Sequence, residues 1–418
     1  MAMQRVLDAL LRRLITEGRL EVHWPDRSVT TYEGSPGGSA AVALTDAATV
    51  RRLVLNPSLA LGEAYMAGGV VPVECSLYEL LDLLVANATA AGGGTGIMRL
   101  RARLGRLIRY LAQYNPAPRA RRNAAHHYDL NGRLYSLFLD RDRQYSCAYF
   151  RRGDETIDEA QVAKKRHIAA KLLLDRPDLS VLDIGCGWGG LALTLARDYG
   201  ARVLGITLSS EQLTEARARA SVAGLADRVR FELLDYRAVN QQFDRIVSVG
   251  MFEHVGIVHY GTFFAALKRC LAPDGVALLH AIGRSDGPGA TNRWIGKYIF
   301  PGGYSPALSE VLPAVERTGL WVTDVEILRL HYAETLARWR RRFLANRDTI
   351  GSVTDERFCR MWEFYLVGAE LAFRREGHMV FQMQLAREQT AVPLTRDYIS
   401  EADGAESQDF PQGKSMIA

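Results

Sequence analysis

Short apolar runs alternate with helix-length segments from Ser180 onward. The runs are VLDIG, VLGIT, VRFELL, FDRIVSV and VALLHAI, and a segment of helical length separates each from the next. Apolar strands separated by helices are typical of βαβ units, in which helices cover both faces of a parallel sheet. The pattern therefore predicts an α/β domain of Rossmann-like architecture with a mostly parallel sheet. The run WVTDVEIL after Gly319 is expected to add a late edge strand.

The N-terminal part of the chain has a different pattern. Its first twenty residues are typical of an amphipathic helix, and LEVHWPDRSVTTYEG alternates around PDR like a hairpin. SPGGSAAVALTDAATVRRLVLN indicates a turn, a strand and a helix, and LALGEAYMAGGVVPVECSLYELLDLLVANA a loop followed by an apolar helix. Because this region has no catalytic constellation, we predict a smaller α+β domain at residues 1–95 for binding or scaffolding.

Composition suggests the remaining boundaries. TAAGGGTG is typical of a flexible joint, and a basic linker helix is expected after it, at residues 96–125. The α/β pattern falls in a catalytic domain predicted at residues 126–390. The tail at residues 391–418 has few apolar anchors, so we expect it to be mobile.

Several classes of protein do not fit the composition. No run of 18 uncharged apolar residues occurs, so no membrane-spanning helix is predicted. The five cysteines are odd in number and scattered, without a CxxC pair, which indicates reduced thiols, a cytoplasmic setting and no structural zinc site. No metal ligand set is predicted elsewhere. No zinc-finger or RNA-recognition signature suggests nucleic-acid binding.

One segment is strongly basic. From Arg99 to Arg122 the chain holds eight arginines and no acid, although its net charge is only +5. A solvated helix face is the ordinary interpretation of such a segment. The interleaved Leu, Ile and Tyr also suit a helix lying on an anionic membrane interface.

A glycine-rich turn follows the first strand of the α/β pattern. In VLDIGCGWGG, Gly185 and Gly187 allow close approach of the backbone to a ligand, and the following helix offers free N–H groups. The turn lacks the Lys-Ser/Thr pair of a nucleotide-triphosphate loop. With Asp183 ahead of the glycines, the pattern fits the S-adenosylmethionine (SAM) site of class I methyltransferases.

Polar residues at the next strand ends extend this predicted site. Thr207 stands where a dinucleotide-binding protein carries a ribose-binding acid. Gln212 either contacts the ligand or completes a helix-capping box with Ser209. Asp235 could bond an adenine amine and Tyr236 could stack on the ring, or Tyr236 is a surface aromatic.

Proton-handling groups follow two neighbouring strands at the same edge of the sheet. Glu253 and His254 come after FDRIVSV, and His280 ends the next strand. Two such groups at adjacent strand ends favour an acceptor site over core histidines. Nearby aromatic residues either pack in the core or line an apolar channel that stabilises a developing cation; they are Tyr145, Tyr149, Phe150, Trp294, Tyr298, Phe300, Tyr304, Tyr332 and Trp339.

Several motifs together carry a family resemblance. QYSCAYF, DEAQVAKK, VLDIGCGWGG, DRIVSVGMFEHVG, LLHAIG and KYIFPGG occur in this order between about His126 and Gln384. In these motifs the chain resembles bacterial cyclopropane-fatty-acyl-phospholipid synthases. LGEAYM, at Leu61–Met66, is similar to the lipid-facing domain of the long bacterial members.

The resemblance implies a class I methyltransferase fold with a seven-stranded sheet, a homodimer, and action on unsaturated acyl chains of membrane phospholipids from the cytoplasmic membrane face. His254 is expected to be structural. The SAM site would comprise Tyr145, Ser146, Asp183, Gly185, Gly187, Thr207, Gln212, Asp235 and Tyr236. A bicarbonate ion would be held by Cys147, Glu253, His280, the backbone of Ile282, and Tyr332, and would take the proton released as the ring closes.

Three alternatives stay open at this point. The same carbocation could lose a different proton and give a methyl- or methylene-branched chain. The fold could also methylate a small amine, although the N-terminal domain and the basic segment disfavour this. A non-catalytic lipid-binding or SAM-sensing protein would have no need of the complete set of acceptor-site residues.

Overall fold

The computed structural model describes residues 2–90 and 132–404. Its largest element is a seven-stranded sheet in the order β10-β11-β9-β8-β5-β6-β7. The strands from β9 to β7 are parallel, and β11 is antiparallel to both β9 and β10. The bounds are β5 Ser180–Ile184, β6 Arg202–Thr207, β7 Val229–Leu233, β8 Phe243–Val249, β9 Leu271–Arg284, β10 Trp321–Leu328 and β11 His378–Ala386.

This sheet confirms the predicted α/β class and the five apolar strands. The expected edge strand is β10, which lies at one end of the sheet. The sequence reasoning missed β11, the run HMVFQMQLA. Every residue of β11 after His378 is buried, so the strand has no alternation that could mark it in the sequence.

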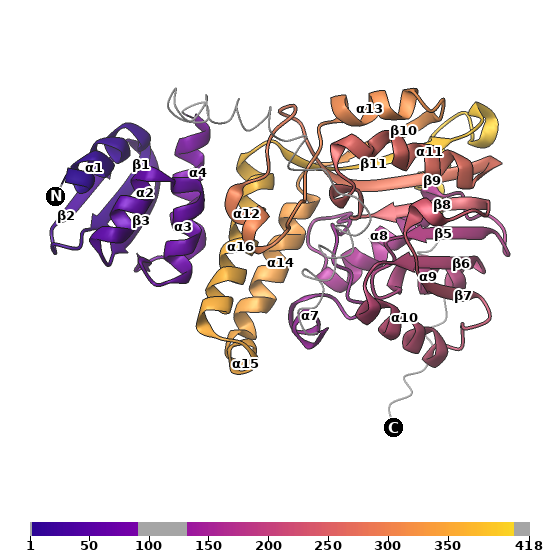
Figure 1. The fold of residues 1–418 in the computed structure, drawn as a ribbon, viewed down its shortest axis with the longest axis horizontal. Helices are drawn as coiled ribbons and strands as arrows, with labels where there is room; N and C mark the ends of the chain where they lie inside the picture. Colours follow the sequence, from indigo (N-terminus) through magenta and orange to yellow (C-terminus); the bar gives the residue numbers. More distant parts are fainter. Residues whose placement is uncertain (1, 91–131, 405–418) are drawn as a thin grey trace.

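Helices cover both faces of the sheet (Figure 1). On one face, side chains of α11 (Tyr260–Cys270) and α13 (Leu308–Glu316) join an apolar cluster with β8, β9 and β11. On the other face, α8 (Ile157–Lys171), α9 (Gly190–Tyr199) and α10 (Ser210–Val222) pack against β5, β6 and β7. Because both faces are covered, polar groups of the sheet are left accessible at the strand ends, which is where α/β sheets bind ligands.

The N-terminal domain is a four-stranded sheet with four helices. The hairpin of β1 (Glu17–His23) and β2 (Val29–Glu33) is confirmed. Two other predictions are wrong, because SPGG begins strand β3 (Ser35–Leu44) and the expected loop contains a helix and a strand. Pro57 occupies the first turn of that helix, where its missing N–H costs nothing. The remaining elements are α1 Ala2–Leu14, α2 Ala47–Leu55, α3 Pro57–Met66, β4 Val70–Val73 and α4 Leu77–Ala90.

A third group of helices lies between the N-terminal domain and the sheet (Figure 1). Val367 and Leu371 of α16 pack against Tyr65, Leu77 and Leu81 of the N-terminal domain. Arg375 of α16 also pairs with Asp82 of α4 at 2.7 Å. The two domains therefore share a continuous apolar contact. The helices of this group are α7 Gly132–Phe138, α12 Arg293–Tyr298, α14 His331–Ala345, α15 Arg347–Val353 and α16 Glu356–Arg375.

The predicted mobile tail is partly wrong. Asp397–Gly404 form a helix, α17, which packs near α8. The Gln384 amide donates to the Tyr398 hydroxyl at 2.8 Å and anchors this helix to β11. The basic linker at 96–125 and the last residues of the tail lie outside the described residues. Within 2–90 and 132–404, no helix is long and apolar enough to cross a bilayer.

The contact between α3 and α12 yields a prediction. A Cβ atom at Gly62 would lie 2.5 Å from Nε1 of the buried Trp294. Gly62→Leu should therefore lower the free energy of unfolding by about 1–3 kcal/mol through overpacking. Gly261→Ala in α11 is the control, because a Cβ there meets nothing within 4 Å. Urea denaturation of both variants would show the difference, and equal stability would contradict the close packing of the two domains.

Candidate active site

Two cavities lie at the carboxyl edge of the sheet. All nine residues predicted for the cofactor line the first, which we call the glycine-turn cavity. All five residues predicted for the acceptor site line the second, the aromatic cavity, with a volume of about 520 Å³. Four residues line both cavities, so occupants of the two would meet there; they are Tyr145, Ser146, Gly250 and His254.

The glycine turn has a backbone that favours glycine. Gly185 and Gly187 have φ values of +85° and +56°. An added Cβ at Gly185 would lie 2.9 Å from the Met251 side chain, whereas one at Gly187 would meet nothing within 4 Å. The backbone conformation at position 187 therefore favours glycine, and the space around it leaves room for a ligand.

Asp183 is a buried carboxylate facing this cavity. Its Oδ2 atom has no hydrogen-bond partner among the described residues. Burial raises the pKa of the Asp183 carboxyl to about 7, and the Lys164 ammonium opposes this rise. Such a group gains from a cationic or N–H-donating ligand, which fits the amine of SAM.

The polar residues at the next strand ends bond mainly to one another. The Thr207 hydroxyl donates to Oε1 of Gln212 at 2.8 Å. Ser209 caps α10 by accepting from the Gln212 N–H, but the Gln212 side chain bonds to Thr207, so the full capping box is wrong. The Asp235 carboxylate accepts from the backbone and guanidinium of Arg237, so a ligand amine would share its oxygens.

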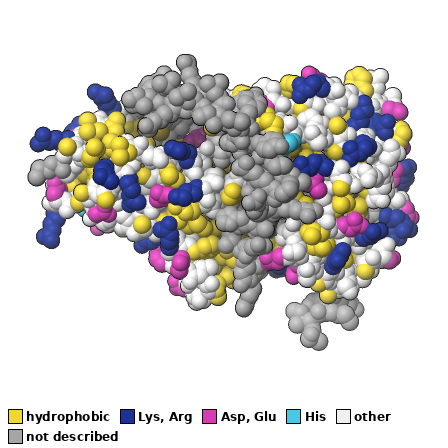
Figure 2. Space-filling view, in the orientation of Figure 1, with side chains coloured by type: hydrophobic (Ala, Val, Ile, Leu, Met, Phe, Trp, Pro, Cys, Tyr) yellow, Lys and Arg dark blue, Asp and Glu magenta, His cyan; other side chains and the backbone are white. Residues whose placement is uncertain are grey.

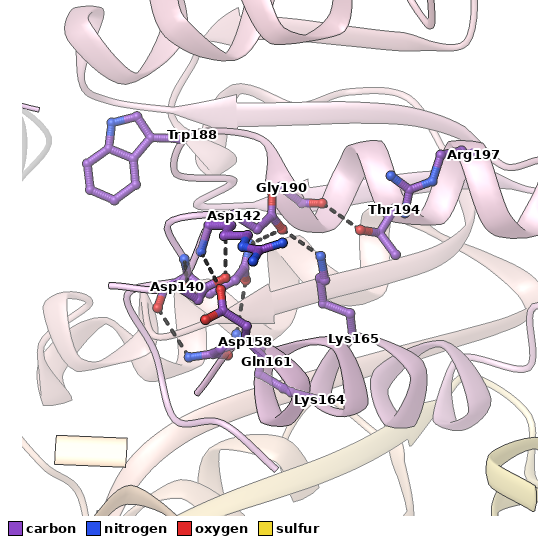
Figure 3. A network of polar contacts seen from close by, with 12 residues as sticks. Asp140, Asp142, Asp158, Gln161, Lys164, Lys165, Trp188, Gly190, Thr194 and Arg197 are labelled. Atoms are coloured by element: carbon purple, nitrogen blue, oxygen red, sulfur yellow. Dashed lines mark hydrogen bonds and ion pairs between the residues drawn. The ribbon is translucent and has the colours of Figure 1, made fainter. Parts of the chain in front are cut away.

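The loop that carries Tyr145, Ser146 and Cys147 is held by α8. Figure 3 shows Gln161, Lys164 and Lys165 of α8 near the carboxylates of the loop. The Lys164 ammonium donates to Oγ of Ser146 at 2.7 Å. The Gln161 amide donates to the carbonyl of Ser146 at 2.9 Å. Both contacts lie within the wall shared by the two cavities, so α8 determines where that wall stands.

Lys164 is a site residue that the sequence reasoning missed. It is fully buried, and desolvation lowers its pKa to about 8. Its second contact, to Oε1 of Gln144 at 3.0 Å, crosses twenty positions of sequence. The spacing of residues does not show that a lysine is buried, although the motif DEAQVAKK contains Lys164.

Glu253 follows strand β8 at the edge of the sheet and lines the aromatic cavity. The Ile282 N–H donates to Oε1 of Glu253 at 2.7 Å. The Oε2 atom has no hydrogen-bond partner among the described residues. Burial raises the pKa of the Glu253 carboxyl to about 7, and the Ile282 N–H opposes the rise. One carboxylate oxygen is therefore oriented by the backbone while the other is available to a ligand or proton.

His280 is held by Gln382, a residue that the sequence reasoning also missed. The Gln382 amide nitrogen lies 3.1 Å from Nδ1 of His280. With Gln382 as donor, Nδ1 accepts and the imidazole proton resides on Nε2. Burial lowers the pKa of His280 well below its usual range, so the ring is neutral. The missing signal is understandable, because Gln382 lies on the unpredicted strand β11.

The other predicted residues have distinct environments. Burial raises the pKa of the Cys147 thiol, which stays protonated and is no thiolate nucleophile. Burial also lowers the pKa of His254 to about 4. Among the nine aromatic residues, five line the aromatic cavity: Tyr145, Trp294, Phe300, Tyr304 and Tyr332. The other four pack in or against the core beside it: Tyr149, Phe150, Tyr298 and Trp339.

The contacts of Lys164 predict a defect in cofactor binding. Lys164→Met keeps the volume of the side chain but leaves the buried Ser146 hydroxyl without its donor. We expect SAM affinity to fall about tenfold, because an unmet buried polar group costs about 1–3 kcal/mol. Lys268→Met, distant from both cavities, is the control. Isothermal titration calorimetry measures the affinity, and unchanged binding by Lys164→Met would refute a role in placing the loop.

The raised pKa of Glu253 predicts a pH-dependent stability. Between its usual value of 4.5 and about 7, folded protein holds a proton that unfolded protein has released. The free energy of unfolding should therefore fall as pH rises through this window, by about 3 kcal/mol in total. Glu253→Gln should remove this contribution, so the variant should lose less stability than wild type between pH 5 and pH 8, while the contribution of Asp183, whose pKa is also raised, remains. Denaturation at pH 5 and pH 8 tests this, with Glu232→Gln on β7 as the control.

Comparison with known proteins agrees with this geometry. The family model described as mycolic acid cyclopropane synthetase matches residues 116–383, and a domain of unknown function (DUF7884) matches residues 6–92. The chain is 43% identical over 259 residues to a probable fatty acid methyltransferase of Pseudomonas putida. That match covers 60% of this chain and 65% of the relative, so it spans just under two thirds of that protein.

Two further similarities extend the match. The cyclopropane-fatty-acyl-phospholipid synthase of Escherichia coli K12 is 40% identical over 342 residues, which cover 81% of this chain and 85% of that protein. The crystal structure of mycolic acid cyclopropane synthase CmaA1 complexed with SAH and CTAB is similar with a TM-score of 0.61 and 34% identity. It covers 65% of this chain and 98% of the other. The chain belongs to the mycolic acid cyclopropane synthetase family and has the fold of its SAM-dependent enzymes.

Proposed function

We propose that the protein is a SAM-dependent cyclopropane-fatty-acyl-phospholipid synthase. The observation that supports this most strongly is the junction of the two cavities at Tyr145, Ser146, Gly250 and His254. One cavity has the glycine turn and the buried Asp183 carboxylate. The other is largely apolar and aromatic, with an oriented carboxylate and a neutral imidazole. A methyl donor and an acyl chain would meet in the shared wall.

The proposed reaction adds one carbon to a cis double bond. One alkene carbon forms a bond to the methyl group of SAM, and the bond from that methyl group to sulfur breaks. The rest of SAM leaves as a neutral thioether, and the other alkene carbon becomes a cation. A proton then leaves the new methyl group, and its electron pair closes the three-membered ring. Aromatic faces in the cavity favour the cation, and a site that excludes water protects it from hydration.

The residues around Glu253 suit a small anion that accepts this proton. Oε2 of Glu253 is buried without a protein partner among the described residues, the His280 imidazole is neutral, and the Cys147 thiol is protonated. With the Ile282 backbone and Tyr332, these groups would hold bicarbonate. Bound there, bicarbonate would supply the base. Glu253 and His280 would orient it, and the raised pKa of Glu253 fits a carboxyl that shares a proton with an anion.

A fatty-acid C-methyltransferase is the alternative. The Pseudomonas putida relative carries such a name, and the same cation could lose a different proton to give a methyl- or methylene-branched chain. Small-amine methylation has less support, because a cavity of about 520 Å³ with an apolar, aromatic wall exceeds what a small amine needs.

We further propose that the enzyme acts at the inner face of the membrane as a peripheral homodimer. Leu61, Leu81 and Val85 of the N-terminal domain line the aromatic cavity, so this domain would form one wall of the acyl site. On the face drawn in Figure 2, basic side chains of described residues are interspersed with acidic ones. We assign docking on anionic lipid to the basic segment Arg99–Arg122, which lies outside the described residues.

Product analysis tests the reaction. Purified protein, SAM and vesicles of monounsaturated phospholipid are incubated with and without bicarbonate, and the released fatty acids are analysed by mass spectrometry. We expect gain of one methylene unit, loss of the double bond and stimulation by bicarbonate. Glu253→Gln should reduce the rate at least a hundredfold, because oriented proton acceptors contribute about this much.

The other outcomes distinguish the alternatives. The same mass gain with a surviving double bond would identify a C-methyltransferase. No mass gain despite bound SAM would overturn both lipid reactions. Arg→Glu changes across Arg99–Arg122 that left vesicle binding intact would overturn the docking proposal.

A further inference from the structure

One wall of the aromatic cavity is a ladder of paired residues from β9 and β11. The pairs are His280 with Gln382, Ile282 with Val380, and Arg284 with His378. Alternate residues of a strand face the same side, so these pairs follow one another along one face. His280, Ile282, Arg284, Val380 and His378 all line the cavity. The wall is therefore polar at the reacting end, apolar in the middle and polar again at the far end.

The far end, which we call the rim, is where the cavity approaches solvent. It consists of Arg284, His378 and Glu376, all of which line the cavity. The Glu376 carboxylate is half-exposed, and Nδ1 of His378 lies 3.9 Å from it. The Arg284 guanidinium pairs with Asp286, itself half-exposed, at 2.5 Å.

Charges at the rim are not balanced by the protein. Burial lowers the pKa of His378 to about 4, so at neutral pH its ring is uncharged and does not offset Glu376. Its Nδ1 atom has no hydrogen-bond partner among the described residues. Desolvation raises the pKa of Glu376, the Arg284 guanidinium partly opposes this rise, and the nearby Asp286 carboxylate adds to it. Asp286 takes two of the five N–H donors of Arg284, and the other side-chain donors have no hydrogen-bond partner among the described residues.

We propose that the rim binds a zwitterionic phospholipid headgroup, with its phosphate on Arg284 and its ammonium on Glu376. This inference rests on the proposed function, because it assigns the polar end of the same substrate. A guanidinium and an unbalanced carboxylate side by side complement a phosphate and an ammonium joined by a short linker. A headgroup with a phosphate and hydroxyls alone would leave Glu376 without a cation.

The ladder also sets the distance from the headgroup end to the reacting bond. Four residues separate His280 from Arg284, which corresponds to about 13 Å along the strand. An extended chain advances about 1.2 Å per single bond. Counted through the glycerol and the ester, the alkene would therefore lie roughly eleven bonds from the phosphate, and the enzyme would select double bonds near one position along the chain.

The headgroup test uses vesicles of phosphatidylethanolamine and of phosphatidylglycerol with identical cis-monounsaturated chains. Wild type should convert the ethanolamine lipid with a kcat/KM about tenfold higher. Glu376→Gln should remove that preference by slowing the ethanolamine lipid alone. Glu316→Gln on α13, away from both cavities, is the matched control. An equal effect of Glu376→Gln on both lipids, or no effect on either, would overturn the assignment of the ammonium.

A second measurement tests the distance. Ethanolamine lipids with the double bond moved four carbons toward or away from the ester should react at least fivefold more slowly, and equal rates would overturn the ladder as a ruler. Absence of product from every lipid would refute the proposed function itself. Product formed without any dependence on headgroup or Glu376 would refute only the rim.

Discussion

The hydrogen bond from the Ile282 N–H to Glu253 connects strand β9 of the sheet to the carboxylate of the acceptor site. Strand β8 ends at Val249, which pairs with His280, so β9 extends beyond its parallel neighbour. Farther along β9, the Ile282 N–H would lack an acceptor in the core. The Glu253 carboxylate supplies it at 2.7 Å. A buried backbone donor thus fixes a buried carboxylate, and each offsets the desolvation cost of the other.

This bond explains why a charged residue follows an apolar strand. The raised pKa of Glu253 shows that one N–H does not fully offset its burial. The second oxygen therefore keeps a tendency to take a proton or to contact a polar ligand. His280, two residues before Ile282 on β9, is also biased toward its neutral form, because burial lowers its pKa. Active sites commonly depend on such groups whose environments disfavour the usual protonation state.

The sequence predicted the parallel strands well because their signal is local. Apolar runs between helical segments define βαβ units without reference to distant residues, and the strand ends then bring Asp183, Thr207, Asp235 and Glu253 to one edge. Lys164 and Gln382 could not be predicted in this way. The contact between Gln382 and His280 spans 102 positions and depends on an antiparallel strand with no alternation. The helix α3 was missed because Gly62 inside it and the pair Gly68-Gly69 after it favour a loop, although its alanines and leucines favour a helix.

The four residues common to both cavities have a consequence for how the two ligands bind. A group that shifts the loop at Tyr145 and Ser146 changes the wall seen from either side. Donor and acceptor affinities are then linked by a single coupling free energy, and the linkage is reciprocal. If the bound methyl donor changes the affinity for the acyl chain by some factor, the bound acyl chain changes the affinity for the methyl donor by the same factor. Because α8 holds that loop through Gln161 and Lys164, the rigidity of one helix sets how strongly the two equilibria depend on each other.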